Sequence, residues 1–125
     1  MDRVVVAPAR VFGRNDDNEL LGAYVPTLVL EWLRDRPQER HRVLDCTLVF
    51  ADISGFTRMT EMLAVRGKIG AEEIGDLIDA TFEPLLEKAY EYGAGLIKFG
   101  GDAILLLFQD AGHAVRGCRA AHEMQ

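Results

Sequence analysis

Apolar residues recur at helical spacing near both ends of the chain. Pro26 suits the first turn of a helix, and the pattern after it predicts a helix that ends before Pro37. The apolar stripe of this helix consists of Leu28, Val29, Trp32 and Leu33. Close to residue 125, a second stripe predicts an amphipathic helix from Ala111, Ala114, Val115, Cys118 and Ala121. We expect the tryptophan and the phenylalanines in the core rather than in a ligand site.

The middle of the chain predicts two consecutive helices. The first covers residues 57–66, and Gly67 and Gly70 interrupt the pattern before the second begins at Ala71. Pro84 lies inside the second helix, where it is expected to introduce a kink. The apolar stripe of this long helix consists of Ile74, Leu77, Ile78, Phe82, Leu85, Leu86 and Ala89.

Three shorter runs predict strands. Residues 43–53 are rich in strand formers, and the apolar runs at 96–99 and 103–108 flank Gly100 and Gly101 as in a β-hairpin. Helices join the first strand to 96–99, so these two strands are expected to be parallel, with a right-handed crossover. The fold class is therefore α/β (α+β), with most of a ferredoxin-like sheet but without its final strand. We expect the chain to be the first part of a longer protein.

Composition narrows the class of protein. The chain has 125 residues, enough for one domain, and 49% of them are hydrophobic, which excludes general disorder. A net charge of −6 argues against nucleic acid as a partner. The apolar runs are far shorter than the roughly 20 residues of a membrane span, and no signal peptide is evident. Cys46 and Cys118 are expected to be reduced and buried, in a cytoplasmic protein.

Local composition divides the chain into three parts. Residues 1–19 mix glycine, asparagine and aspartate with a few valines and are expected to form a loosely ordered leader. Residues 20–42 supply the N-terminal helix and a charged connector, and residues 43–125 form the main domain. The histidines at 41, 113 and 122 lack a compact metal spacing, so we expect them to face solvent.

Two aspartates end otherwise apolar runs: Asp52 in VFADISGFT and Asp102 in KFGGDAILLLF. If the first strand lies beside the hairpin, these carboxylates converge, and they would repel each other unless a cation lay between them. Mg²⁺ binds through one or two carboxylates completed by substrate phosphates and water, and the carbonyl of Ile53 could add a ligand. Alternatively, Asp52 caps the following helix and Asp102 is an ordinary turn residue.

The residues after Asp52 predict an anion site beside the metal site. SGFT opens a helix, and the free N–H groups of Gly55, Phe56 and Thr57 are suited to phosphates. A metal and a triphosphate would then lie side by side, as two-metal nucleotidyl chemistry requires.

These motifs carry a family resemblance. FADISGFTRMTE followed by LIKFGGDAILLLF resembles the class III nucleotide cyclases, and YVPTLVLEWLRDRP resembles the first catalytic domain of soluble-adenylyl-cyclase-like proteins. The resemblance covers residues 20–125. It implies a palm-type cyclase fold, conversion of ATP to cyclic AMP and pyrophosphate, and a second cyclase domain, in a dimer or in the same polypeptide. It also implies two Mg²⁺ (or Mn²⁺) ions held by Asp52, Ile53 and Asp102, with the phosphates bound at residues 55–57.

The resemblance gives Lys98 two alternative roles. It lies four residues before Asp102, where homodimeric adenylyl cyclases place a lysine that recognises adenine. In the first domain of soluble adenylyl cyclases, a lysine there serves a degenerate pseudo-site that binds bicarbonate. Without either role, Lys98 is a lysine on an exposed strand edge. The family's later strands, which carry its transition-state asparagine and arginine, lie beyond residue 125, so we do not expect catalysis by this chain alone.

Two other functions compete with a cyclase. One is a catalytically inactive cyclase-homology domain that pairs with another cyclase domain and regulates it. The other is a diguanylate-cyclase-like palm domain, which shares the Gly-Gly-Asp turn. That class expects acidic and aromatic residues after the turn, whereas Ala103 and Ile104 follow it here.

Overall fold

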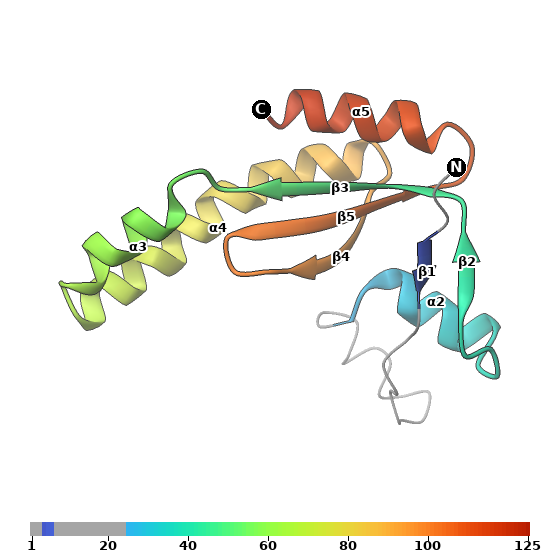
Figure 1. Ribbon diagram of the computed structural model, residues 1–125, viewed down its shortest axis with the longest axis horizontal. Coiled ribbons are helices and arrows are strands. Elements are labelled where there is room, and N and C mark those ends of the chain that lie inside the picture. Colours follow the sequence, from blue (N-terminus) through green and yellow to red (C-terminus); the bar gives the residue numbers. More distant parts are fainter. Residues whose placement is uncertain (1–3, 7–24) are drawn as a thin grey trace.

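The computed structural model describes residues 4–6 and 25–125. Figure 1 shows the strands and helices of the described chain. In chain order they are β1 (Val4–Val6), α2 (Thr27–Asp35), β2 (Arg42–Leu44), β3 (Cys46–Asp52), α3 (Phe56–Ala64), α4 (Lys68–Glu91), β4 (Gly95–Phe99), β5 (Ala103–Gln109) and α5 (His113–Glu123).

Strands β3, β5 and β4 form a three-stranded sheet in that spatial order. Both β3 and β4 run antiparallel to β5, with Phe50 opposite Leu105 on one side and Lys98 opposite Leu105 on the other. As predicted, β3 and β4 are therefore parallel to each other, although β5 lies between them. The α+β fold class is confirmed, and a three-stranded sheet is compatible with a truncated palm.

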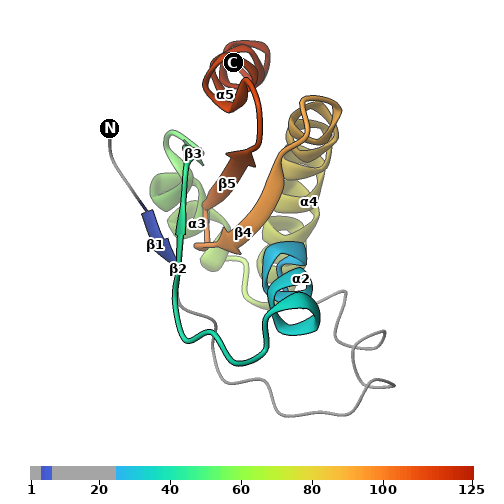
Figure 2. The same cartoon turned by 90° about the vertical axis from the view of Figure 1, so that its right-hand side faces the viewer.

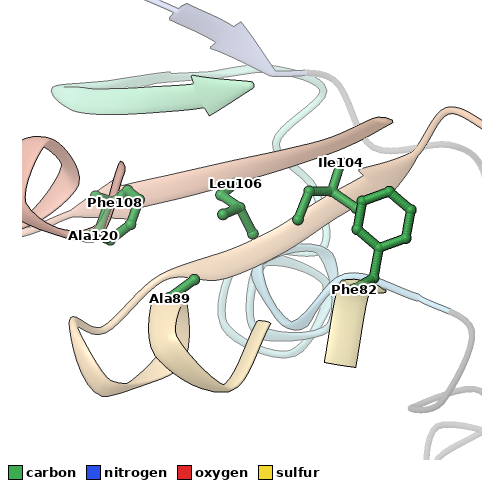
Figure 3. Packing of buried hydrophobic residues seen from close by; sticks show 6 residues of the cluster. All are labelled: Phe82, Ala89, Ile104, Leu106, Phe108 and Ala120. Carbon is green, nitrogen blue, oxygen red and sulfur yellow. The ribbon is translucent and has the colours of Figure 1, made fainter. Parts of the chain in front are cut away.

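Helices α4 and α5 cover one face of this sheet. Successive side chains of β5 point to opposite faces of the sheet, as in any strand. Those of Ile104, Leu106 and Phe108 point towards these helices. Figure 3 shows Phe82 beside Ile104 and Ala120 beside Phe108. This cluster forms the main core, because its residues are almost completely buried.

The opposite face is covered at one end only. Helix α2 packs against β4 there (Figure 2). Leu28 of α2 meets Leu107 and Leu44 in a second, smaller cluster. Trp32 of α2 is 1% exposed, so the prediction that it belongs to the core is confirmed. Beyond α2 the face is open, and Phe50 is 68% exposed.

The single strand predicted at 43–53 is wrong, because this segment forms two strands. Asp45, a poor strand former, lies exposed between β2 and β3. Strand β2 pairs with β1 in a separate two-stranded sheet, whereas β3 joins the main sheet. The chain thus passes from one sheet to the other at Asp45. Except for Val4–Val6, the predicted leader at 1–19 lies outside the described residues.

The boundary predicted at Gly70 is also wrong. Helix α4 begins at Lys68, and Gly70 is buried inside its first turn. A Cβ atom at Gly70 would lie 1.8 Å from the carbonyl oxygen of Leu63 in α3. Gly70 is therefore a contact point between two helices rather than a break. The helix then continues through Pro84 to its end at Glu91.

The apolar stripe predicted for α5 does not face the core. Val115 and Cys118 are exposed, and the buried residues are Gly117 and Ala120. Glycine is not counted as apolar, so the sequence pattern gave no sign that Gly117 faces the core. A Cβ atom at Gly117 would lie 2.9 Å from Cγ2 of Thr47, so only glycine fits there. Because α5 packs closely on β3, the side of α5 that faces the sheet consists of small residues, Gly117 and Ala120.

Several single-residue expectations are corrected as well. Both cysteines are free, but Cys46 is only partly buried and Cys118 is exposed. Phe50 and Phe99 are exposed, unlike Phe82 and Phe108, because Phe50 lies on the open face and Phe99 ends the edge strand β4. Within the described residues, no helix is both long enough and apolar enough to span a membrane.

Candidate active site

The two aspartates lie on neighbouring backbone segments at one end of the sheet. Asp52 ends β3 and is paired with Ala103, the first residue of β5. The backbone N–H of Ile53 donates a hydrogen bond to the carbonyl oxygen of Asp102, with an N···O distance of 3.0 Å. The strand end and the hairpin turn are therefore joined directly. This adjacency is the arrangement that the sequence predicts for a shared cation.

The local sequence fixes the position of each carboxylate. Gly101 has a φ of 79°, a left-handed conformation that favours glycine, and the N–H of Gly100 donates to the carbonyl of Ala103 at 2.7 Å. This closed turn presents Asp102, which is partly buried. Asp52 is exposed because it lies on the open face of β3, two residues beyond Phe50.

The start of α3 lies directly after Asp52. Gly55 adopts a φ of 82° and precedes the helix without a side-chain cap. The N–H of Phe56 donates to the carbonyl of Ile53 at 3.3 Å, so this predicted phosphate donor and this predicted metal ligand are bonded to each other. A carbonyl oxygen has a second lone pair, so Ile53 can still bind a cation. The N–H groups of Gly55 and Thr57 find no acceptor within the described chain.

Lys98 lies away from this group. Lys98 is exposed and faces the same side of the sheet as Asp52. Their partners on β5, Leu105 and Ala103, are two residues apart and therefore lie on the same face, the one away from α4 and α5. Two strand spacings and an offset of two residues separate the Cα atoms of Lys98 and Asp52 by about 12 Å. Lys98 therefore lies on the same face of the sheet as Asp52 but is not its direct neighbour.

Two cavities lie beside the predicted residues. Asp52 and Ile53 line one of about 440 Å³, together with residues at the C-terminal end of α5. Lys98 lines another of about 640 Å³ between α2 and β4, which also includes Glu31 and Tyr90. No sequence pattern pointed to Glu31 of α2 or Tyr90 of α4, because only tertiary packing brings these two helices to the same cavity.

A polar cluster that the sequence did not predict lies at the other end of β3. The Nδ1 atom of His113 and Oγ1 of Thr47 are hydrogen-bonded at 2.8 Å, and Nε2 of His113 lies 3.6 Å from a carboxylate oxygen of Asp45. The expectation that His113 faces solvent is therefore wrong, because its ring is partly buried between these two residues. Burial, followed by the nearby charge of Asp45, raises the pKa of the Cys46 thiol and keeps it protonated.

The donor set at Asp52 and Asp102 fits a hard cation that is bound together with a substrate. No group of three or more His, Cys, Asp or Glu side chains suited to a metal occurs in the described residues. A self-sufficient protein metal site is therefore not formed by that part of the chain. Two carboxylates and one carbonyl instead match the Mg²⁺ sites that substrate phosphates and water complete.

The chain is similar to adenylate cyclases. It is 32% identical over 93 residues to adenylate cyclase type 10 of Rattus norvegicus and 33% identical over 93 residues to that of Homo sapiens. Each match covers 71% of this chain, which spans about 6% of the length of these mammalian proteins. An adenylate cyclase of Streptomyces griseus is 37% identical over 65 residues, 52% of this chain and 15% of that protein. No protein-family profile matches. The alignments and the α+β fold together identify this chain as carrying a class III cyclase-like domain.

Proposed function

We propose that this domain is part of a metal-dependent nucleotide cyclase that converts ATP to cyclic AMP and pyrophosphate in intracellular signalling. The observation that carries the proposal is the hydrogen bond from Ile53 to Asp102, which joins the two carboxylate-bearing segments. The similarity to proteins named adenylate cyclase supports the same reaction.

In the proposed mechanism, Asp52, Asp102 and the carbonyl of Ile53 would hold two Mg²⁺ or Mn²⁺ ions. When bound, the ions would activate the ribose 3′-oxygen for attack on the α-phosphate and neutralise the leaving pyrophosphate. The free N–H groups of Gly55 and Thr57 bind phosphate oxygens at the positive end of α3. Phe56 contributes less than the sequence predicts, because its N–H already has an acceptor.

A second cyclase domain is the proposed partner, in a dimer or in the same polypeptide. The sheet face that carries Asp52 and Lys98 is open beyond α2, and Leu48 and Phe50 lie exposed on it. A partner that covers this apolar surface would also exclude water from the ligand.

Lys98 has a separate role in this proposal. Its Cα atom lies about 12 Å from that of Asp52, so Lys98 is not an immediate neighbour of the proposed metal ligands. It lines its own cavity, where its ammonium group can donate to a purine ring nitrogen or attract a small anion such as bicarbonate.

The test is metal binding by the 125-residue chain with a non-hydrolysable ATP analogue. We expect Asp52→Asn and Asp102→Asn each to weaken Mn²⁺ binding about tenfold or more, because each removes a charged ligand of the same ions. Electron paramagnetic resonance of free Mn²⁺ measures this directly. The matched control is Asp76→Asn on α4, an exposed carboxylate outside the site, which should leave affinity unchanged.

Unchanged Mn²⁺ affinity in either site variant would contradict the shared metal site. Metal-dependent nucleotide binding with no formation of cyclic AMP, even alongside a complete cyclase domain, would instead favour the alternative of an inactive domain that regulates its partner.

A further inference from the structure

A groove runs along α4 on the side that faces the hairpin strand β4. We call it the α4 groove, and its volume is about 460 Å³. Asp52, Asp102 and Lys98 do not line it, although Tyr90 and Phe99 also line the Lys98 cavity. The residues that do are Ile78, Asp79, Phe82, Glu83, Leu86, Glu87, Tyr90 and Phe99.

The floor of the α4 groove is apolar, and an aromatic contact holds it together. The rings of Phe82 and Phe99 meet edge to face, with centroids 5.8 Å apart, which fixes the wall formed by β4 to the helix. Tyr90 and Phe99 are each 49% exposed, so large aromatic surfaces remain open to a partner. Exposed aromatic residues in a groove are typical anchors of protein interfaces.

One rim of the α4 groove is a row of carboxylates. Asp79, Glu83 and Glu87 follow one another at intervals of four residues, so they line up on one side of the helix. Like charges at this spacing destabilise a helix. The lining includes no lysine or arginine. The row is therefore a strip of negative charge beside an apolar surface.

Most of the other acidic residues of α4 have a basic partner, unlike the three carboxylates of the groove. Glu72, Glu73 and Glu91 each form an ion pair, with Lys68, Arg66 and Lys88 respectively. By contrast, no ion pair involves Asp79, Glu83 or Glu87 within the described ranges. Within the same ranges Asp76 also has no ion pair and lies outside the groove, but the other three unpaired acidic residues of α4 all line it.

We propose that the α4 groove binds a basic amphipathic helix of a partner protein. Three carboxylates at four-residue intervals span about 12 Å along the helix axis, so lysines or arginines at the same interval on a second helix can face them. Apolar residues on that helix would then enter the groove between Tyr90 and Phe99. The groove uses the helix-in-groove mode of recognition, with charge setting the choice of partner.

The experiment measures binding of a synthetic peptide to the 125-residue chain by fluorescence anisotropy. The probe is an 18-residue leucine–lysine peptide with leucines at helical spacing. A peptide of the same composition with scrambled order, and a leucine–glutamate peptide, are the comparison probes. We expect the amphipathic lysine peptide to bind best and to lose affinity as salt is raised, because exposed charges are screened.

Matched variants separate the groove from the general negative charge of the chain. The triple variant Asp79→Asn, Glu83→Gln, Glu87→Gln should bind the peptide roughly tenfold more weakly, as the loss of three exposed ion pairs implies. The triple variant Asp35→Asn, Glu39→Gln, Glu61→Gln removes the same charge from exposed sites elsewhere and should bind within about twofold of the original chain. Tyr90→Ser should weaken binding at any salt concentration, because it removes an apolar anchor.

Three outcomes would overturn the proposal. The scrambled peptide could bind as tightly as the amphipathic one, which would indicate charge attraction alone. The control triple variant could lose as much affinity as the groove variant. Sedimentation could also show that the chain self-associates through the groove, with the groove variant monomeric, in which case a second copy of this chain is the occupant.

Discussion

At the scale of single residues, one exposed polar cluster joins α4 to α5. The hydroxyl of Tyr92 donates a hydrogen bond to Glu123, and Nζ of Lys88 lies 2.7 Å from Glu91 and 3.5 Å from Glu123. The Tyr92 hydrogen bond, with help from Lys88, lowers the pKa of Glu123. The same bond to Glu123 is the main cause that raises the pKa of Tyr92.

These shifts predict how stability depends on pH. Because the pKa of Glu123 is lower in the folded than in the unfolded state, its contribution is present above the unfolded pKa and is lost as pH falls through the folded one. Tyr92→Phe should therefore lower the melting temperature at pH 7 and matter less in acid. Circular-dichroism melts between pH 7 and pH 3 measure this. Tyr90→Phe is the control, and a constant difference at every pH would contradict the prediction.

The sequence predicted the two aspartates but not the His113 cluster, for a physical reason. Asp52 and Asp102 each interrupt an apolar run, so a charge at the edge of a strand is visible in the sequence itself. Thr47 and His113 are 66 positions apart, and both residue types are common on surfaces. Only the packing of α5 on β3 brings them together, and no local pattern encodes that contact.

At the scale of elements, two glycines of α4 have opposite roles. Gly70 is buried against α3, where a side chain would collide with the backbone of Leu63. Gly75 lies five residues further along on an exposed side, and a Cβ atom there would have no neighbouring atom within 4 Å. The same substitution at these two sites therefore separates helix propensity from helix packing.

We expect Gly75→Ala to stabilise the protein by up to about 1 kcal/mol, because alanine is the better helix former. Gly70→Ala should destabilise it by about 1–3 kcal/mol, because α3 and α4 must move apart. Urea unfolding curves give both values. Because α3 begins at the proposed phosphate site, Gly70→Ala should also weaken binding of the ATP analogue. Equal stability changes for the two variants would show that Gly70 is not a packing contact.

The sequence predicts which segments are helices or strands, but not which side of a helix is buried or where the chain passes between sheets. Periodicity was sufficient for α2, α3 and the β4–β5 hairpin, since each has a local apolar pattern and a local stop. It failed at Asp45, where one apolar run divides between two sheets. It failed again in α5, where glycine and alanine form the inner side. In both cases tertiary contacts decide, and the local pattern does not report them.

At the scale of the whole molecule, the sheet has one closed and one open face. Helices α4 and α5 close the first, and α2 covers only one end of the second (Figure 1). Leu48 and Phe50 lie on the open part, on the same strand as Asp52. An exposed apolar surface beside charged ligand groups is typical of an interface that a partner completes.

If a second cyclase domain covers this face, Phe50 lies at its apolar centre. The chain should then self-associate as its concentration rises, and Phe50→Asp should weaken that association about tenfold or more, since burying the new charge is unfavourable. Phe50 is already 68% exposed, so the melting temperature of the monomer should change little. Val65→Asp is the control, because Val65 is 89% exposed at the turn between α3 and α4. Analytical ultracentrifugation measures the association constants. A chain that stays monomeric throughout, or an equal loss in both variants, would show that the open face does not pair with a copy of itself.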